Sequence, residues 1–241
     1  MTAPIDVYYW PTPNGHKVTI ACEEMDLAYE IKPVNIGAGE QFTPEFLAIS
    51  PNNRMPAIVD PDGPGGAPIS VFESGAILQY LGRKTGLFYP ADERARVQVD
   101  EWVHWQMGNL GPMAGQRNHF RNYSPSFLLD QRQSAYGAAR YTNEVERLYG
   151  VLDKRLAGRE WMAGDYSIAD MITWPWVAGK SSGALEVEAF AHLTAWHARM
   201  AARPAVQRAL AKADGVRGVG LQQSTAQAEA ARKILFGQRA R

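Results

Sequence analysis

The first ninety residues alternate between strand-like and helix-like spacing of their apolar positions. Residues 5–10 are rich in β-branched and aromatic side chains and predict a strand. Val18, Ala21, Cys22 and Met25 then recur at helical spacing. The chain is therefore predicted to begin with a strand that leads into a helix.

The same reading predicts three more strands and two more helices before residue 90. The strands are predicted over 29–36, 55–60 and 69–73, and the helices over 44–49 and 74–84. The segment 61–68 is dense in proline and glycine, which indicates a hairpin between the last two strands. The predicted order is βαβ, a short helix, then ββα.

Strand signals vanish after residues 86–90, so we expect two domains, 1–88 and 93–241. Two apolar stripes predict two long helices of a bundle: Val99, Trp102, Val103, Met107, Leu110 and Met113, then Ala138, Tyr141, Val145, Leu148, Leu152 and Leu156. Further helices are predicted over 168–177, 189–202, 205–212 and 222–236. The expected fold class is an α/β N-terminal domain followed by an all-α helical bundle.

Composition and charge describe an ordinary globular protein. Hydrophobic residues make up 46% and charged residues 21%, which favours a sizeable buried core. Twenty-five basic residues balance 25 acidic ones, which argues against a nucleic-acid partner. The apolar stretch 172–179 is far shorter than the roughly 20 residues that span a bilayer, and the N-terminus lacks the pattern of a secretory signal. We therefore expect a cytoplasmic protein without a membrane segment.

The single cysteine, Cys22, excludes an intrachain disulfide and a Cys-x-x-Cys redox pair. Redox chemistry would have to use thiols supplied by another molecule. The five histidines show no metal-ligand spacing, so no metal is expected. Phosphate-binding loops, dinucleotide-binding turns and the serine-hydrolase elbow have no matching motif, which leaves nucleotide-dependent and serine-hydrolase functions unsupported.

The turn Trp10-Pro11-Thr12-Pro13-Asn14-Gly15 joins the first predicted strand to the first helix. One interpretation is structural, because such a junction needs turn formers and a helix cap in any case. The other is functional, because a helix N-terminus stabilises an anion. If that anion is a thiolate, Thr12 and Asn14 can donate to its sulfur and lower the thiol pKa from roughly 8.5 towards neutrality.

Three segments together resemble the glutathione-site segments of cytosolic glutathione transferases: Thr12-Pro13-Asn14-Gly15-His16-Lys17-Val18, Asn53-Arg54-Met55-Pro56-Ala57-Ile58-Val59-Asp60 and Phe72-Glu73-Ser74-Gly75-Ala76-Ile77-Leu78. The Thr-Pro-Asn-Gly form is similar to the bacterial nu-class and related fungal members, which are noted for glutathione-dependent disulfide-bond reduction. The resemblance implies a thioredoxin-like N-terminal domain, an all-helical C-terminal domain, a homodimer, and glutathione as co-substrate.

The resemblance also implies roles for individual residues. Met55 and Pro56 would form the cis-proline loop, whose backbone pairs with the cysteinyl residue of glutathione. Ser74 would hold the γ-glutamyl carboxylate while Glu73 accepts from the ammonium group. The alternative for this pair is a plain helix start with an acidic first turn. Gln41 would contact the ligand backbone, although a loop glutamine is usually solvated.

Two residues of the helical region are implied to cross a dimer interface. In similar enzymes an arginine at the position of Arg140 extends from the partner subunit towards the glutathione carboxylates. The alternative is an i, i+4 pair with Glu144. Asn109 would reach across in a similar way. The segment 167–170 resembles the family's helix-capping box, with an expected role in folding rather than catalysis.

Two other nucleophile or activator candidates are less favoured. Tyr8 or Tyr9 would act as the catalytic tyrosine of other transferase classes, but both lie inside the predicted strand. Cys22 lies on the apolar stripe of the first helix and is expected to be a buried thiol.

The expected function is therefore glutathione-dependent disulfide reduction. Conjugation of glutathione to an electrophile, or reduction of an organic peroxide, uses the same thiolate and remains an alternative. A regulatory or binding module with the transferase fold is an alternative of another class.

Overall fold

The computed structural model describes residues 3–124, 131–177, 189–217, 230–231 and 233–235. They form two compact units. The first contains the residues up to Leu81 together with those from Pro204 onward, and the second contains Gly82–Arg203. The predicted domains 1–88 and 93–241 stay a prediction.

The first unit is built on a four-stranded mixed sheet. Its strands are β1 (Ile5–Tyr9), β2 (Tyr29–Pro33), β3 (Ala57–Asp60) and β4 (Ile69–Phe72), in the order β2-β1-β3-β4. β1 and β2 are parallel, whereas β3 is antiparallel to both β1 and β4. The helical elements are α1 (Pro13–Glu24), η1 (Glu40–Phe42), α2 (Pro44–Ile49), η2 (Pro64–Gly66) and α3 (Ser74–Thr85). The predicted order of strands and helices is confirmed, and it is that of a thioredoxin-like domain.

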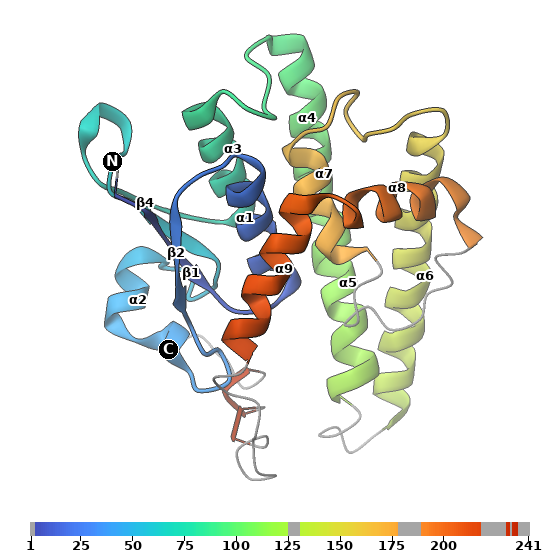
Figure 1. Cartoon of the computed structure of the whole chain (residues 1–241). Helices are drawn as coiled ribbons and strands as arrows, with labels where there is room; N and C mark the ends of the chain where they lie inside the picture. The colour runs from blue at the N-terminus through green and yellow to red at the C-terminus, as the bar shows by residue number, and fades with distance from the viewer. Residues whose placement is uncertain (1–2, 125–130, 178–188, 218–229, 232, 236–241) are drawn as a thin grey trace. The chain divides into compact units, whose positions relative to one another are not determined.

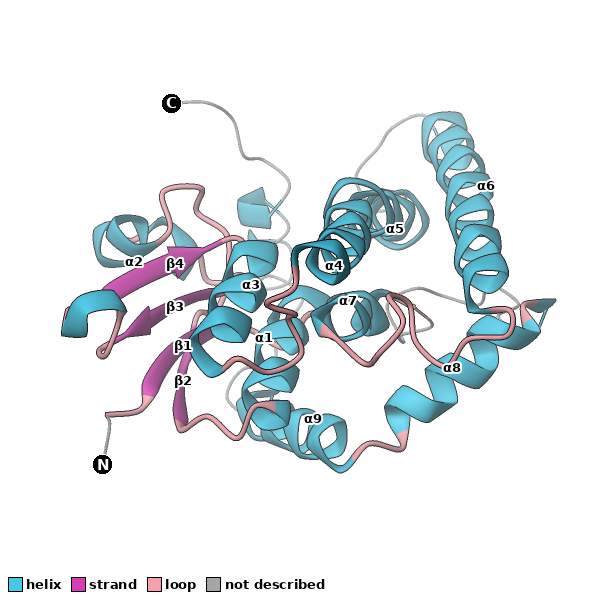
Figure 2. Cartoon of the chain, turned by 90° about the horizontal axis from the view of Figure 1, so that it is seen from above, coloured by secondary structure: helices cyan, strands magenta, loops and turns pink. Residues whose placement is uncertain are grey.

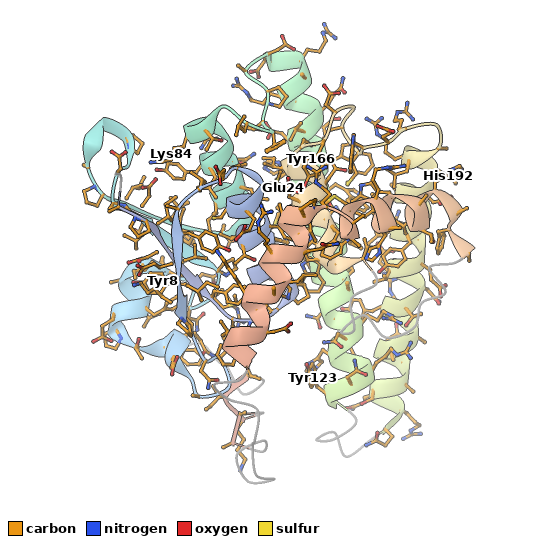
Figure 3. All side chains as sticks on the ribbon, viewed as in Figure 1. Tyr8, Glu24, Lys84, Tyr123, Tyr166 and His192 are labelled. Carbon is orange, nitrogen blue, oxygen red and sulfur yellow. The ribbon has the colours of Figure 1, made fainter. Side chains whose placement is uncertain are left out.

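The two faces of the sheet are covered by different helices. Figure 2 shows α1 and α3 along one face. Strand β1 has alternating burial, in which Val7 and Tyr9 are completely buried. Tyr8 points to the other side, where its ring centroid lies 6.0 Å from that of Phe46 on α2 (Figure 3). This period-two alternation is what a strand between two layers requires.

All the named elements of the second unit are helices. These are α4 (Glu93–Trp105), η3 (Gln106–Leu110), α5 (Gly111–Asn118), η4 (His119–Tyr123), α6 (Gln131–Leu156), α7 (Ile168–Thr173), η6 (Trp174–Trp176) and α8 (Ala191–Ala201), of which η3 and η4 are π-helical. The two predicted long helices are confirmed as the run from α4 to η4 and as α6. The helix predicted over 168–177 is too long, because α7 ends at Thr173 and a short 3₁₀ turn follows. Pro175 has no N–H to donate and disfavours a continuing α-helix.

The start of α7 has the capping box that the sequence predicts. The Ser167 side chain accepts from a backbone N–H of the first turn, and the Asp170 carboxylate accepts from the Ser167 N–H at 3.1 Å. Asp170 is completely buried and also accepts from the Met162 N–H at 3.1 Å and from Trp196 Nε1 at 2.8 Å. Burial raises the pKa of Asp170 to about 6, although these donors oppose the shift. Its bonds join three segments of the second unit, as a folding role requires.

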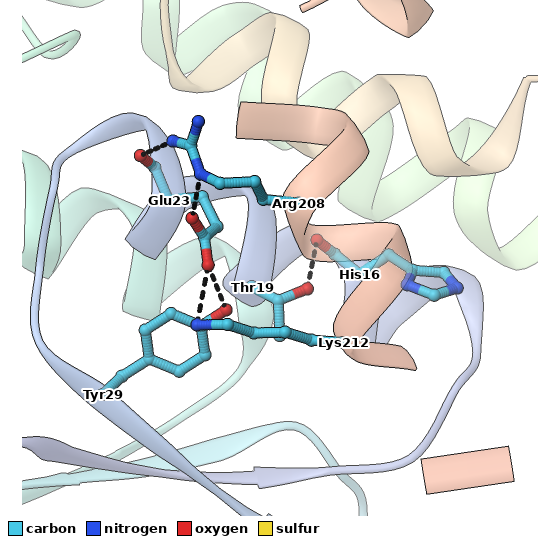
Figure 4. A network of polar contacts seen from close by, with 6 residues as sticks. All are labelled: His16, Thr19, Glu23, Tyr29, Arg208 and Lys212. Atoms are coloured by element: carbon cyan, nitrogen blue, oxygen red, sulfur yellow. Dashed lines mark hydrogen bonds and ion pairs between the residues drawn. The ribbon is translucent and has the colours of Figure 1, made fainter. Parts of the chain in front are cut away.

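The last long helix, α9 (Pro204–Arg217), belongs to the first unit and packs on α1 (Figure 1). Figure 4 shows the polar network between them. The Glu23 carboxylate lies 2.7 Å from Arg208 Nε and 2.8 Å from Lys212 Nζ, and it accepts from the Tyr29 hydroxyl at 2.8 Å. Burial favours a higher pKa for Glu23, but the bonds from Lys212, Arg208 and Tyr29 outweigh it and hold the pKa below its ordinary value. Glu23 therefore fastens α9 to both α1 and β2.

Two further observations concern the C-terminal helix prediction and the length of the apolar helices. Of the helix predicted over 222–236, only residues 230–231 and 233–235 are described, and these are helical; the remainder lies outside the described residues. No helix in the described ranges combines the length and the apolar character needed to cross a bilayer.

We predict that Glu23→Gln lowers the free energy of unfolding by about 1–3 kcal/mol, because two cations lose their carboxylate partner at a side chain only 9% exposed. The matched control is Glu30→Gln, whose carboxylate is 58% exposed and pairs with Lys32. This control should change stability by less than about 0.5 kcal/mol. Urea unfolding measures both variants, and equal losses would contradict the anchoring role of Glu23.

Candidate functional site

Thr12 is the N-cap of α1 and stands where β1 ends. Its backbone is extended (φ −123°, ψ 162°), and its hydroxyl oxygen accepts from the Gly15 N–H at 3.3 Å. Pro13 occupies the first helical position, where a missing N–H costs nothing. The structural interpretation of this turn, that it holds a helix cap, is therefore confirmed, because Thr12 caps α1.

The Thr12 hydroxyl also has a second partner. It donates to the sulfur atom of Met55, with Oγ1 and Sδ 3.6 Å apart. Met55 is buried directly before β3, and the Met55–Pro56 peptide bond is cis, as the resemblance implied. The structure thus brings together two of the three segments singled out in the sequence.

Gly15 is required by the close packing behind this turn. A Cβ atom on Gly15 would lie 2.3 Å from the Trp10 carbonyl oxygen and 2.8 Å from the Tyr9 ring. Tyr9 is completely buried, and its hydroxyl lies 3.1 Å from His16 Nδ1. With Tyr9 in the core and Tyr8 against α2, neither tyrosine occupies the turn where a sulfur would be held.

The third segment forms the start of α3. The Glu73 carbonyl accepts from the Ile77 N–H at 2.9 Å, so Glu73 precedes the helix as its cap residue. Its φ of 68° is left-handed, a conformation that costs a non-glycine residue roughly 1–2 kcal/mol. The exposed Glu73 carboxylate accepts from Asn52 Nδ2 at 3.3 Å, and the neighbouring Ser74 is buried. A strained cap residue that keeps its carboxylate accessible is typical of ligand sites.

Lys17 is the residue that our sequence reasoning missed. It lies on α1 with only 1% of its surface exposed, and its Nζ donates to Ser74 Oγ at 3.3 Å. Burial lowers the pKa of Lys17 to about 7, and the charge of Glu73 opposes this shift. The available signal was its position one helical turn before Ala21, which places it on the buried face of α1.

Asn14 and Gln41 differ in how the structure places them. Asn14 is half-buried in the first turn of α1, beside Thr12. Gln41 is only 2% exposed, which argues against the alternative of a solvated loop glutamine, and its contact with the ligand backbone stays a prediction. Its Nε2 donates to the Ile36 carbonyl at 3.2 Å, whereas its Oε1 is buried with no hydrogen-bond partner among the described residues. Gln41 therefore carries one unused acceptor.

Arg140 and Asn109 both lie in the second unit. Arg140 is exposed on α6, and Asn109 is half-buried in the π-helical segment η3. The Glu144 carboxylate accepts from Arg147 at 2.9 Å and 2.8 Å, and these bonds, together with the charge of Arg140, hold the pKa of Glu144 below its ordinary value. The alternative of an Arg140–Glu144 pair therefore stays open as a charge interaction. Arg147 is one turn further along α6 and reaches both carboxylate oxygens.

Cys22 is completely buried, as predicted. Burial raises the pKa of its thiol to about 12, because the apolar surroundings disfavour a thiolate. Among the described residues, no group of three or more His, Cys, Asp or Glu side chains is arranged to hold a metal ion.

Comparisons with known families and curated proteins agree with this arrangement. The model of the glutathione S-transferase N-terminal domain matches residues 3–83, and that of the C-terminal domain matches residues 119–204. Disulfide-bond oxidoreductase YfcG of Escherichia coli is 47% identical over 211 residues, which cover 87% of this chain and 95% of YfcG. Disulfide-bond oxidoreductase YghU of the same organism is 37% identical, covering 85% of this chain and 73% of YghU.

Solved structures give the same result. A glutathione transferase from Pseudomonas putida, with one glutathione disulfide bound per subunit, superposes with a TM-score of 0.80 and 44% identity over 86% of this chain and 90% of its own. A glutathione transferase family member from Pseudomonas fluorescens, with two glutathione molecules bound, superposes with a TM-score of 0.78 and is 45% identical. The match covers 86% of this chain and 92% of the Pseudomonas fluorescens chain. Fold and site thus define a thioredoxin-like domain joined to a helical one. The chain belongs to the glutathione S-transferase family and is an enzyme of that family.

We predict that Lys17 makes folding stability rise with pH. Between pH 7 and about 10 the unfolded chain keeps the Lys17 proton while the folded protein has lost it, so the unfolded state binds more protons and stability increases. Relative to Lys17→Met, the wild type should gain at most about 4 kcal/mol over this range.

Urea unfolding at pH 6.5, 8 and 9.5 measures the difference. Lys32→Met is the control, because Lys32 is exposed on β2 and paired with Asp6 and Glu30. It should show no such rise. Parallel pH profiles for the wild type and Lys17→Met would refute the prediction.

Proposed function

We propose that this enzyme binds glutathione, activates its thiol at Thr12 and Asn14, and uses the thiolate to reduce disulfide bonds. The observation that carries the proposal is the hydrogen bond from Thr12 Oγ1 to Met55 Sδ. The Gly15 N–H occupies one acceptor site of the Thr12 oxygen, so the hydroxyl proton is directed away from it and towards a sulfur atom. A thiolate is a charged and therefore stronger acceptor than a thioether, and it would take this proton in place of Met55.

The position of the turn adds to the stabilisation of a thiolate. The first N–H groups of α1 have no partner within the helix, and the helix dipole favours negative charge at this end. Asn14, in the first turn, carries a side-chain amide that can also donate. Together these groups lower the pKa of a bound thiol from its ordinary value of roughly 8.5.

The remaining residues match the other parts of the tripeptide. Met55, directly before β3, offers its backbone to the cysteinyl residue in the manner of an added strand. Glu73 accepts from the γ-glutamyl ammonium group, and Ser74 donates to the carboxylate beside it. Gln41 has a buried acceptor that a backbone N–H of the ligand would satisfy.

The proposed reaction needs two glutathione molecules. The first thiolate attacks one sulfur of the substrate disulfide, which breaks the S–S bond, forms a mixed disulfide and releases a substrate thiolate. The second thiolate attacks the glutathione sulfur of the mixed disulfide, which releases the second substrate thiolate and yields glutathione disulfide. Two electrons pass from two glutathiones to one disulfide, and the protons lost by the two thiols are available to the product thiolates. Cys22 takes no part, because its thiol is buried and protonated.

Related proteins support this reaction. YfcG and YghU are both named disulfide-bond oxidoreductases. The Pseudomonas fluorescens structure contains two glutathiones, and the Pseudomonas putida structure contains one glutathione disulfide per subunit. These are the reactant pair and the oxidised product of the scheme above.

The proposal includes a homodimer in the cytoplasm. Arg140, exposed on α6, would extend to the glutathione carboxylates of the partner subunit, with Asn109 in a similar role. The helical domain, 93–241, would supply the pocket for the disulfide substrate. The cytoplasm maintains the reduced glutathione that this reaction consumes.

We predict that Thr12→Ala lowers disulfide reductase activity about 10- to 100-fold, because a hydrogen bond to a charged sulfur contributes about 1.5–3 kcal/mol. Thr12→Ser should restore most of the activity, since serine keeps the hydroxyl. Coupled assay of glutathione disulfide formation measures this, and calorimetric titration with glutathione measures binding.

Thr43→Ala is the matched control for the loss of a helix cap. Thr43 caps α2 by accepting from the Phe46 N–H at 3.3 Å, the same distance as in the Thr12–Gly15 pair. Both variants should lose about 1 kcal/mol of stability, but only Thr12→Ala should lose activity. An active Thr12→Ala variant, or wild-type protein that takes up no glutathione, would overturn the proposed function.

We also predict that Cys22→Ala retains activity to within about twofold, because the buried thiol has no route to substrate and its high pKa keeps it protonated. The same coupled assay applies. Loss of activity without loss of folded protein would assign the chemistry to Cys22 instead of to bound glutathione.

A further inference from the structure

Lys17 is an ionisable side chain in a buried position that strongly disfavours its charged form. It is 1% exposed, and it lies on the same face of α1 as residues that are completely buried. A lysine is almost never buried to this degree without a specific partner. One partner here is the hydroxyl of Ser74, which begins α3, and the charge of Glu73 also acts on the amine.

The hydrogen bond from Lys17 determines how Ser74 can act. A serine hydroxyl has one proton and two acceptor sites. Lys17 Nζ is a donor to Ser74 Oγ at 3.3 Å, so the Ser74 proton must point away from Lys17.

We propose that Lys17 is a positioning residue for the γ-glutamyl end of glutathione: it fixes the Ser74 hydroxyl as a donor to the ligand carboxylate, and it places behind the start of α3 an amine that the bound carboxylate favours in its ammonium form. This inference rests on the proposed function, since it concerns the same ligand. It assigns no chemical step to Lys17, which acts through Ser74.

The charges around this position complement an amino acid zwitterion. Glu73 presents an exposed carboxylate whose charge acts on the buried amine of Lys17, and the first turn of α3 follows Glu73 directly in sequence. A ligand ammonium pairs with Glu73, and a ligand carboxylate faces Ser74 and Lys17. Arrival of the carboxylate favours the ammonium form of Lys17, which burial alone disfavours.

Recognition of both charges selects a class of thiols. Lys17 should matter for thiols that carry a free α-amino acid group at the γ-glutamyl position. Cysteinylglycine has the same thiol and the same glycine end but lacks that group. The reaction with cysteinylglycine should therefore not depend on Lys17.

The experiment compares Lys17→Met with wild-type protein, using glutathione and cysteinylglycine as alternative thiols. We expect the KM for glutathione to rise about tenfold with little change in kcat, while kcat/KM with cysteinylglycine stays within about twofold. The exposed-lysine control Lys32→Met should leave both thiols unaffected. Equal losses with both thiols would indicate a merely structural role and overturn the inference.

A double-mutant cycle tests whether Lys17 acts through Ser74. Ser74→Ala should itself raise the KM for glutathione, and adding Lys17→Met to it should cost much less than Lys17→Met costs alone. Fully additive effects would overturn the inference. If Lys17→Met does not yield folded protein, Lys17→Gln is used throughout, because it removes the charge and keeps a polar side chain.

Calorimetric titration with glutathione distinguishes a failure of the Lys17 role from a failure of the proposed function. Wild-type protein that shows no binding would refute the proposed function. Wild-type protein that binds glutathione, together with a folded Lys17 variant that binds it equally well, would refute the role of Lys17 and leave the function standing. Weaker binding by the variant alone is the expected result.

Discussion

A hydroxyl group that accepts a hydrogen bond from a fixed donor must direct its own proton elsewhere, and the site of this protein uses that constraint twice. Thr12 accepts from the Gly15 N–H and donates to a sulfur atom. Ser74 accepts from Lys17, and its proton is thereby directed away from that amine. Both hydroxyls stand at helix N-termini, where an anion is already favoured. The same rule therefore supports both proposed roles, Thr12 as a donor to a thiolate and Ser74 as a donor to a carboxylate.

Helix α1 serves this site through both its exposed end and its buried face. Its first turn lies against β1 so closely that only glycine fits at position 15. The same close packing buries Lys17 and Cys22, with opposite consequences for each side chain. Burial removes the thiol from chemistry by raising its pKa, whereas it holds the amine of Lys17 against Ser74. The proposed reaction therefore takes its reactive sulfur from bound glutathione.

Much of this architecture is visible in the sequence, because it depends on local periodicity and turn residues. The short helix at Pro44–Ile49 and the β3–β4 hairpin were predicted within a few residues of their bounds. The features that were missed depend on contacts between distant residues. Lys17 meets Ser74 across 57 positions, and Gln41 is buried by its fold rather than by its loop composition. Periodicity identifies which face of a helix is buried, but it does not predict which residues that face contacts in the folded protein.

The return of α9 to the first unit shows that the helix carrying the proposed thiol site does not depend on the N-terminal segment alone. The two family models cover residues 3–83 and 119–204, so α9 begins where the second one ends. Yet Arg208 and Lys212 neutralise Glu23, which is the last residue but one of α1. Without α9, a carboxylate that is 9% exposed in the complete protein would keep only the Tyr29 hydroxyl as a partner from β2. The helix whose first turn holds Thr12 is therefore secured at its other end by residues from the opposite end of the sequence.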